Sequence, residues 1–232
     1  MFSKCFLLYD ANEGEVHYMN KQQSFFYISL VVILSVITGW IVTIKKSGVP
    51  YIDQWTRSIV ESVADTKLYI VARWITELGS ESFLIPFTVI MGIILIVVYR
   101  DWLPALLFSG GTLFSHLLNM WIKILVGRER PRIFIEANAE GFSFPSGHSM
   151  ITMVCYGFLM YLLVKKVSSN QLKILIQISF SLLIFLIGIS RFFINVHYIT
   201  DIIAGFTFGF LILLGQMYLF EYIQKQRMLN KH

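Results

Sequence analysis

The chain has 232 residues, of which 56% are hydrophobic and 14% charged, and its formal net charge is +5. Its mean hydropathy of +0.67 is far above that of a soluble domain, so we predict an all-α integral membrane protein. The basic residues are dispersed along the sequence, which argues against nucleic-acid binding and favours the lipid bilayer as partner. Cys5 and Cys155 are too far apart in sequence to indicate a disulfide framework, and no signal peptide is apparent.

Six segments are apolar over about the 20 residues that a helix needs to cross a bilayer. They cover residues 25–44, 82–99, 103–126, 149–164, 173–194 and 199–222. We therefore predict one membrane domain with six transmembrane helices, residues 24–224. It lies between a polar N-terminal segment, residues 1–23, and a basic tail, residues 225–232. No obligate protein partner is evident.

Between the first two spans, apolar residues recur at helical spacing among charges. They are Trp55, Ile59 and Val63, followed by Val71, Trp74, Ile75 and Leu78. This spacing is typical of amphipathic helix at the membrane interface. A packed helical hairpin outside the membrane fits the same pattern, and the sequence leaves both open.

Polar clusters follow the third span, precede the fourth and join the fifth to the sixth. With one crossing per helix, all three clusters must face the same compartment. The opposite side receives both termini and a loop with Lys165, Lys166 and Lys173. The positive-inside rule then places both termini in the cytoplasm and the clusters on the extracytoplasmic face of the cell membrane. In this application of the rule, the basic residues within the three clusters are not counted.

The first cluster holds Lys123 and, seven residues later, Arg130 followed by Pro131. A lysine point charge and the planar donor fork of an arginine together suit a phosphate with several anionic oxygens. Alternatively, Lys123 extends to the interface and the arginines hold lipid headgroups.

The second cluster is Phe-Pro-Ser-Gly-His, residues 144–148. A helix that begins just after the proline has unpaired amides in its first turn, and Gly147 lets an anion approach them. His148 would face such an anion, and its ordinary pKa of about 6.5 suits proton donation. A simple helix cap with an incidental histidine is the alternative.

The third cluster joins Ser190 and Arg191 to His197 and Asp201. If the backbone is helical there, His197 and Asp201 share one face, and Asp201 accepts a hydrogen bond from one imidazole nitrogen. The other nitrogen is then available as a nucleophile. The same pair could instead lock two helices together.

Other polar residues are weaker candidates. His116 could hydrogen-bond to Asn119 or to a neighbouring helix, or relay protons. Arg128 and Arg132 could draw in anionic substrate as second choices. Residues expected to be solvated are Glu129, Glu136, Glu140, His17 and His232.

The three clusters, Lys-x6-Arg-Pro, Pro-Ser-Gly-His and Ser-Arg-x5-His-x3-Asp, occur in the order that the type 2 phosphatidic acid phosphatase family shows. The chain resembles this family at every signature position between Lys123 and Asp201. Glucose-6-phosphatases and vanadium haloperoxidases share the signature. The resemblance implies that His197 forms a phosphohistidine, Asp201 orients it and His148 is the general acid and base. The implied phosphate-binding residues are Lys123, Arg130, Ser146, Gly147 and Arg191, with neither a metal nor another cofactor.

The chain is most similar to bacterial members that dephosphorylate membrane lipids. The resemblance implies undecaprenyl diphosphate or phosphatidylglycerophosphate as substrate, with phosphatidic acid as a third candidate. A carrier or sensor that binds such lipids without turnover is the main alternative, although a binder needs no aligned nucleophile and acid. Haloperoxidase chemistry on bound vanadate is a further alternative, which the six spans disfavour.

Overall fold

A computed structural model of the protein describes residues 21–46, 48–63, 66–131 and 141–230. Its helices are α1 (Lys21–Lys45), α2 (Tyr51–Trp55), α3 (Arg57–Val63), α4 (Lys67–Glu77), α5 (Glu81–Tyr99), α6 (Trp102–Val126), α7 (Gly147–Lys166), α8 (Asn170–Phe193) and α9 (Ile199–Leu229). Most of the N-terminal segment predicted over residues 1–23 lies outside the described residues.

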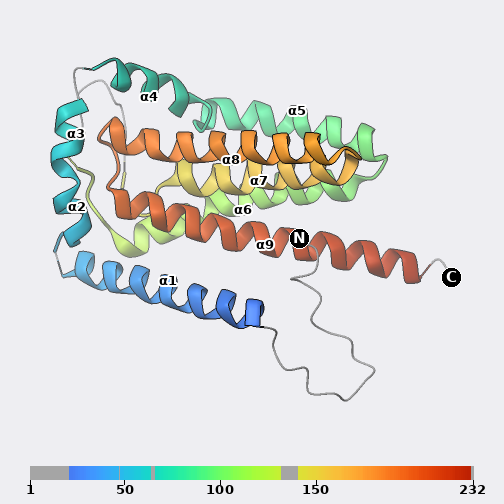
Figure 1. The fold of residues 1–232 in the computed structure, drawn as a ribbon, viewed down its shortest axis with the longest axis horizontal. Helices are drawn as coiled ribbons and strands as arrows, with labels where there is room; N and C mark the ends of the chain where they lie inside the picture. The colour runs from blue at the N-terminus through green and yellow to red at the C-terminus, as the bar shows by residue number, and fades with distance from the viewer. Residues whose placement is uncertain (1–20, 47, 64–65, 132–140, 231–232) are drawn as a thin grey trace.

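Within the described residues, six helices are long and apolar enough to cross a membrane: α1 and α5 to α9. They run alongside one another and confirm the predicted six-helix membrane fold (Figure 1). The predicted ends differ most at α9, which continues to Leu229 and so includes part of the predicted basic tail. Helix-favouring residues such as Gln224 and Lys225 extend it beyond the apolar stretch, and Arg227 anchors it by pairing with Asp101 at 2.8 Å.

Helix α7 forms the centre of the bundle and packs against α6, α8 and α9. In its most apolar stretch 56% of the residues are buried, against 6% in α1. Helix α1 touches the bundle mainly through its C-terminal half, where Ile37 and Ile44 join a cluster with Val126 and Phe144. Figure 1 shows the rest of α1 standing apart from the other long helices.

Two glycines bring α9 close to α7. A Cβ atom at Gly205 would lie 2.6 Å from the carbonyl oxygen of Ser146, and one at Gly209 would lie 2.6 Å from that of Met150. Glycines four residues apart share a helix face, and in membranes they allow helix backbones to approach closely. The start of α7 is therefore held directly against the first turns of α9.

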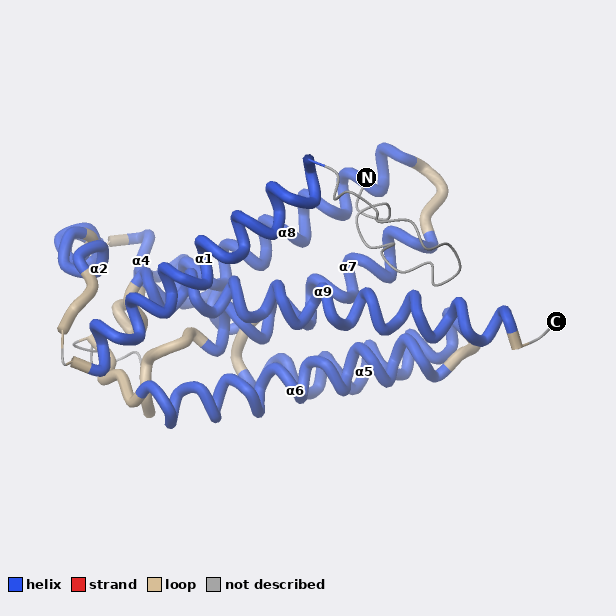
Figure 2. The backbone as a smooth tube through the Cα atoms, turned by 90° about the horizontal axis from the view of Figure 1, so that it is seen from below, coloured by secondary structure: helices blue, strands red, loops and turns tan. Residues whose placement is uncertain are grey.

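The segment between the first two spans forms α2, α3 and α4. Helices α2 and α3 run across one end of the bundle (Figures 1 and 2), and α4 packs on the end of α8. Large aromatic side chains in this segment, including Tyr51, Trp55 and Trp74, are exposed. One face packs on the bundle while the other presents the aromatic residues typical of a membrane interface, which confirms the predicted amphipathic segment.

Candidate active site

The three polar clusters meet at the end of the bundle that α2 and α3 cross. This end contains the C-terminus of α6, the start of α7 and the turn from α8 to α9 (Figure 1). His148 lies within electrostatic reach of Arg191, His197, Lys123 and Arg130. Residues spread over about a third of the sequence thus line one site, as the alternation of the spans predicts.

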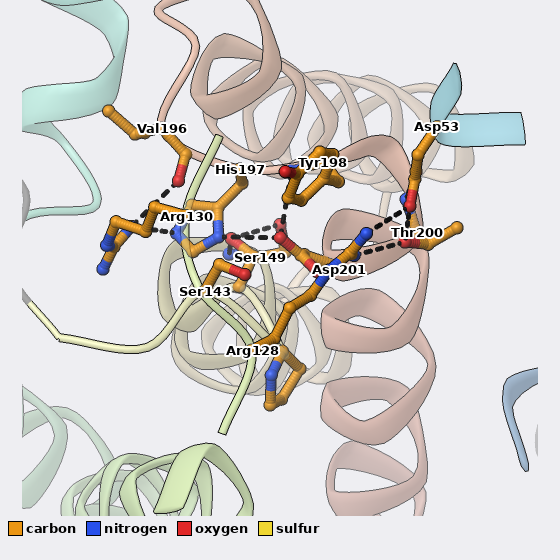
Figure 3. A network of polar contacts seen from close by, with 12 residues as sticks. Asp53, Arg128, Arg130, Ser143, Ser149, Val196, His197, Tyr198, Thr200 and Asp201 are labelled. Atoms are coloured by element: carbon orange, nitrogen blue, oxygen red, sulfur yellow. Dashed lines mark hydrogen bonds and ion pairs between the residues drawn. The ribbon is translucent and has the colours of Figure 1, made fainter. Parts of the chain in front are cut away.

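His197 lies in the turn between α8 and α9 and is only 3% exposed. Its Nδ1 is 3.4 Å from Oδ2 of Asp201, and Nη1 of Arg130 is 3.2 Å from its Nε2 (Figure 3). A guanidinium has only donors, so the contact with Arg130 requires Nε2 to accept. The ring proton then sits on Nδ1, which lies on the side of the carboxylate but has no hydrogen-bond partner among the described residues, and the lone pair on Nε2 faces Arg130.

Burial lowers the pKa of His197 well below the ordinary value for histidine, and the positive charges of Arg130, Arg191 and Lys123 lower it further. The imidazole is therefore neutral at physiological pH, which is the protonation state that a nucleophile needs.

Asp201 is fully buried in the first turn of α9. Its Oδ2 accepts a hydrogen bond from the amide of Tyr198 at 2.9 Å, and its Oδ1 accepts one from Nη1 of Arg128 at 2.6 Å. Tyr198, at the N-cap, has an extended backbone, so His197 precedes the helix. The expected helical face shared by His197 and Asp201 is therefore wrong: the cap turn, and not helical spacing, brings the histidine to the carboxylate.

Three cations lie within electrostatic reach of His197. Arg191, at the end of α8, is buried, and its Nη1 donates to Oγ1 of Thr76 at 3.0 Å. Its buried Nε has no hydrogen-bond partner among the described residues. Arg130 donates to the carbonyl oxygens of Gly141 and Val196, each at 3.0 Å. The half-buried Lys123, in the last turn of α6, interacts electrostatically with both arginines.

Ser146 is the N-cap of α7, and its side chain accepts a hydrogen bond from the amide of Ser149 at 3.4 Å. Its own amide donates to the carbonyl oxygen of Asp201 at 2.9 Å. The polar groups of Ser146 therefore serve the structure, while the amides of Gly147 and His148 begin the helix and have no carbonyl four residues back within it. These two amides are the better candidates for binding an anion.

The imidazole of His148 packs directly over Gly79, in the turn between α4 and α5. A Cβ atom at Gly79 would lie 2.8 Å from Cδ2 of His148 and 2.6 Å from Cγ2 of Ile187. For the acid role that the family resemblance implies for His148, we expect Gly79→Ala to displace the imidazole and to lower kcat by about 10- to 100-fold, because misplacing a catalytic group by an ångström has costs of this size. Gly39→Ala, which adds a methyl group in open space on α1, is the control for steady-state phosphate release. Wild-type turnover in Gly79→Ala would contradict this account of how His148 is placed.

Arg128 is not at the surface, contrary to the expectation that it draws in substrate. It is 6% exposed and bridges two carboxylates, those of Asp53 and Asp201, each at 2.6 Å (Figure 3). Asp53 on α2 and its neighbour Thr200 are site residues that the sequence did not reveal. Asp53 stands between exposed aromatic residues, so nothing in the local pattern distinguishes it from a solvated charge.

The weaker candidates lie elsewhere. Nδ1 of His116 is 3.7 Å from Oε1 of Glu81, so of the two expected partners, Asn119 or a neighbouring helix, it has the second, at the start of α5. Asn119 instead donates to the carbonyl oxygen of Pro145. Glu129 is exposed, as expected. The expectations for Arg132, Glu136, Glu140, His17 and His232 fall outside the described residues.

This fold and this site define a polytopic membrane protein with a buried histidine–aspartate pair beside three cations. The family model of the PAP2 superfamily matches residues 103–225, and the chain belongs to this superfamily.

Named relatives agree with this assignment. The chain is 33% identical to phosphatidylglycerophosphatase B of Bacillus subtilis over 67% of its length and 80% of the relative. It is 29% identical to lipid A 1-phosphatase of Rhizobium etli over 48% of its length and 47% of that protein. It is 26% identical to dolichyldiphosphatase of Saccharomyces cerevisiae over 60% of its length and 63% of that protein.

A solved structure also matches. It is the crystal structure of a transmembrane PAP2-type phosphatidylglycerolphosphate phosphatase from Bacillus subtilis. The TM-score is 0.72 at 28% identity, and the match covers 85% of this chain and 96% of that one.

Proposed function

We propose that the protein, a lipid phosphatase of the PAP2 superfamily, removes the terminal phosphate of a lipid phosphate or diphosphate through a phosphohistidine. The observation that carries the proposal is the environment of His197, whose Nδ1 faces Asp201 and whose Nε2 faces Arg130. A neutral imidazole fixed in this way presents its lone pair where a phosphate held by the cations would lie. A protein that only binds lipid headgroups has no need of this alignment.

In the proposed first half-reaction, Nε2 of His197 attacks phosphorus while the bond from phosphorus to the leaving oxygen breaks. His148 donates a proton to that oxygen, which leaves as an alcohol or as a lipid monophosphate. The carboxylate of Asp201 stabilises the positive charge that develops on the imidazole. In the second half-reaction, His148 takes a proton from water as the water attacks phosphorus, which releases inorganic phosphate and restores His197.

The positive charge for the transition state comes from Lys123, Arg130 and Arg191, together with the amides of Gly147 and His148. These groups hold the phosphoryl oxygens as negative charge shifts toward the leaving oxygen. Because side chains provide this charge, the proposed mechanism uses no metal ion or other cofactor.

The proposed substrates are undecaprenyl diphosphate and phosphatidylglycerophosphate, with phosphatidic acid as a third. The names of the relatives support a lipid with a terminal phosphate or diphosphate. We also propose that both termini are cytoplasmic and that the site faces outward, where a diphosphate carrier released by cell-wall synthesis is exposed. Labelling a cysteine introduced at the exposed Glu129 with an impermeant thiol reagent in intact cells tests this orientation.

Phosphate release by the purified protein in EDTA tests the function. We expect release from at least one of the three lipids at the same rate with and without EDTA, and the ratio of kcat/KM values ranks the substrates. Loss of activity in EDTA that magnesium restores would overturn the metal-free mechanism. Tight lipid binding by folded protein without any release would favour a carrier or sensor.

A further inference from the structure

Asp53 is a buried carboxylate on a helix that lies outside the six spans. It is 3% exposed although its neighbours Tyr51 and Trp55 are 82% and 67% exposed. Its Oδ2 accepts hydrogen bonds from Nη2 of Arg128 at 2.6 Å and from Oγ1 of Thr200 at 2.7 Å, and its Oδ1 accepts one from the amide of Thr200 at 3.1 Å. Asp53 thus binds both to the loop after α6 and to the start of α9 (Figure 3).

Arg128 divides its guanidinium between two carboxylates. Its Nη2 donates to Asp53, while its Nη1 donates to Oδ1 of Asp201 at 2.6 Å and to Oγ1 of Thr200 at 2.8 Å. The ring of Tyr198 covers the guanidinium, with 3.8 Å from Cζ to the ring centroid. This stacking and the two ion pairs fix the plane of the fork.

The division matters because an arginine fork tends to bind a single carboxylate through both of its oxygens. Paired with Asp201 alone, Arg128 would compete for Oδ2, the oxygen that faces Nδ1 of His197. Asp53 occupies the second edge of the fork, so Arg128 reaches only Oδ1. Oδ2 of Asp201 then accepts a hydrogen bond from the amide of Tyr198 and lies 3.4 Å from Nδ1 of His197.

We propose that Asp53 is a positioning residue for catalysis, which acts through Arg128 and Thr200 to keep one oxygen of Asp201 directed at His197. This inference rests on the proposed function, because it assumes that His197 is the nucleophile. The hydrogen bonds of Asp53 go to Arg128 and Thr200, which lie on the Asp201 side of the site. We therefore expect replacement of Asp53 to change the rate of the chemical step and not the affinity for phosphate.

The test replaces Asp53 with asparagine, which keeps the shape but turns an amide group toward Arg128. We expect kcat to fall by about 10- to 100-fold, the range seen when an outer-shell partner of a metal-bound histidine is removed. KM and inhibition by inorganic phosphate should stay within about twofold of the wild type, because Lys123, Arg130 and Arg191 are untouched. Glu61→Gln, which removes an exposed carboxylate from the adjacent α3, is the matched control and should leave kcat unchanged.

A second variant separates positioning from a general structural role. In an Asp201→Asn background, Asp53→Asn should reduce kcat by less than about threefold, because its effect passes through the Asp201 carboxylate. Losses that multiply in the double variant, or wild-type kcat in Asp53→Asn, would overturn the proposal. If Asp53→Asn does not fold, Arg128→Lys takes its place, since a lysine cannot bridge both carboxylates. Losses in kcat that multiply with Asp201→Asn, or wild-type kcat in Arg128→Lys, would then overturn the proposal.

Hydrogen exchange followed by mass spectrometry provides a readout that needs no turnover. Asp53→Asn should speed exchange in a peptide covering residues 196–204 and leave a peptide from the middle of α7 unchanged. If the wild type releases phosphate from no lipid, the proposed function fails, and exchange alone still decides whether Asp53 holds the start of α9. Unchanged exchange at residues 196–204 would overturn the inference in either case.

Discussion

Replacing His197 with alanine should lower phosphate release by at least about four orders of magnitude, the size of effect seen when a covalent nucleophile is removed. The imidazole is buried, neutral and lies between Asp201 and Arg130, so alanine removes the proposed nucleophile together with its alignment. Alanine also removes a polar ring from a buried position, so the fold of the variant must be checked by size-exclusion chromatography in detergent.

The covalent step can be observed directly. Wild-type protein mixed with substrate carrying ³²P in the terminal phosphate and quenched in alkaline denaturant should carry label on His197, and the alanine variant should carry none. His116→Ala removes a histidine whose nearest described partner is Glu81, and it should retain both label and turnover. Substantial turnover in folded His197→Ala protein would show that another group attacks phosphorus.

Replacing His148 with alanine should have an effect that depends on the leaving group. For a lipid alcohol, which needs a proton as it departs, we expect kcat/KM to fall by about 10²- to 10⁴-fold. For p-nitrophenyl phosphate the fall should be much smaller, because p-nitrophenolate leaves without a proton.

The two substrates are compared by kcat/KM because this parameter reports the steps up to loss of the first product. The later attack of water, in which His148 acts as a base, therefore does not enter the comparison. Equal losses on both substrates would show that His148 binds or shapes the site and does not donate the proton. His116→Ala again serves as the control.

Hydropathy located the membrane helices to within a few residues, because a bilayer leaves a chain little choice but helices of about 20 apolar residues. The errors lie where lipid no longer constrains the chain. Helix α8 begins at Asn170, before the predicted start at residue 173, and α9 continues to Leu229 in a polar sequence. Helix ends outside the hydrocarbon region depend on caps and on distant pairs such as Arg227 with Asp101, which periodicity does not reveal.

The convergence of the candidate site was predictable for a similar reason, since alternating spans bring His148 and His197 to one end of the bundle. The sequence did not predict which residues contact and position these two histidines and Asp201. Asp53 and Arg128 are 75 positions apart, and each is surrounded by residues typical of a surface, so their burial follows only from how α2 crosses the bundle. The contact of Gly79 with His148 depends in the same way on tertiary packing.

The hydrogen bond from the amide of Ser146 to the carbonyl oxygen of Asp201 joins the starts of α7 and α9 through the backbone. With Gly205 pressed against the same turn, the helix that carries the proposed acid cannot move far from the helix that orients the nucleophile. In the proposed mechanism the starts of α7 and α9 therefore keep the same relative position in both half-reactions. The departing lipid product and the attacking water occupy the same position in turn. The proposed mechanism therefore predicts ordered product release, in which the dephosphorylated lipid leaves first and inorganic phosphate follows.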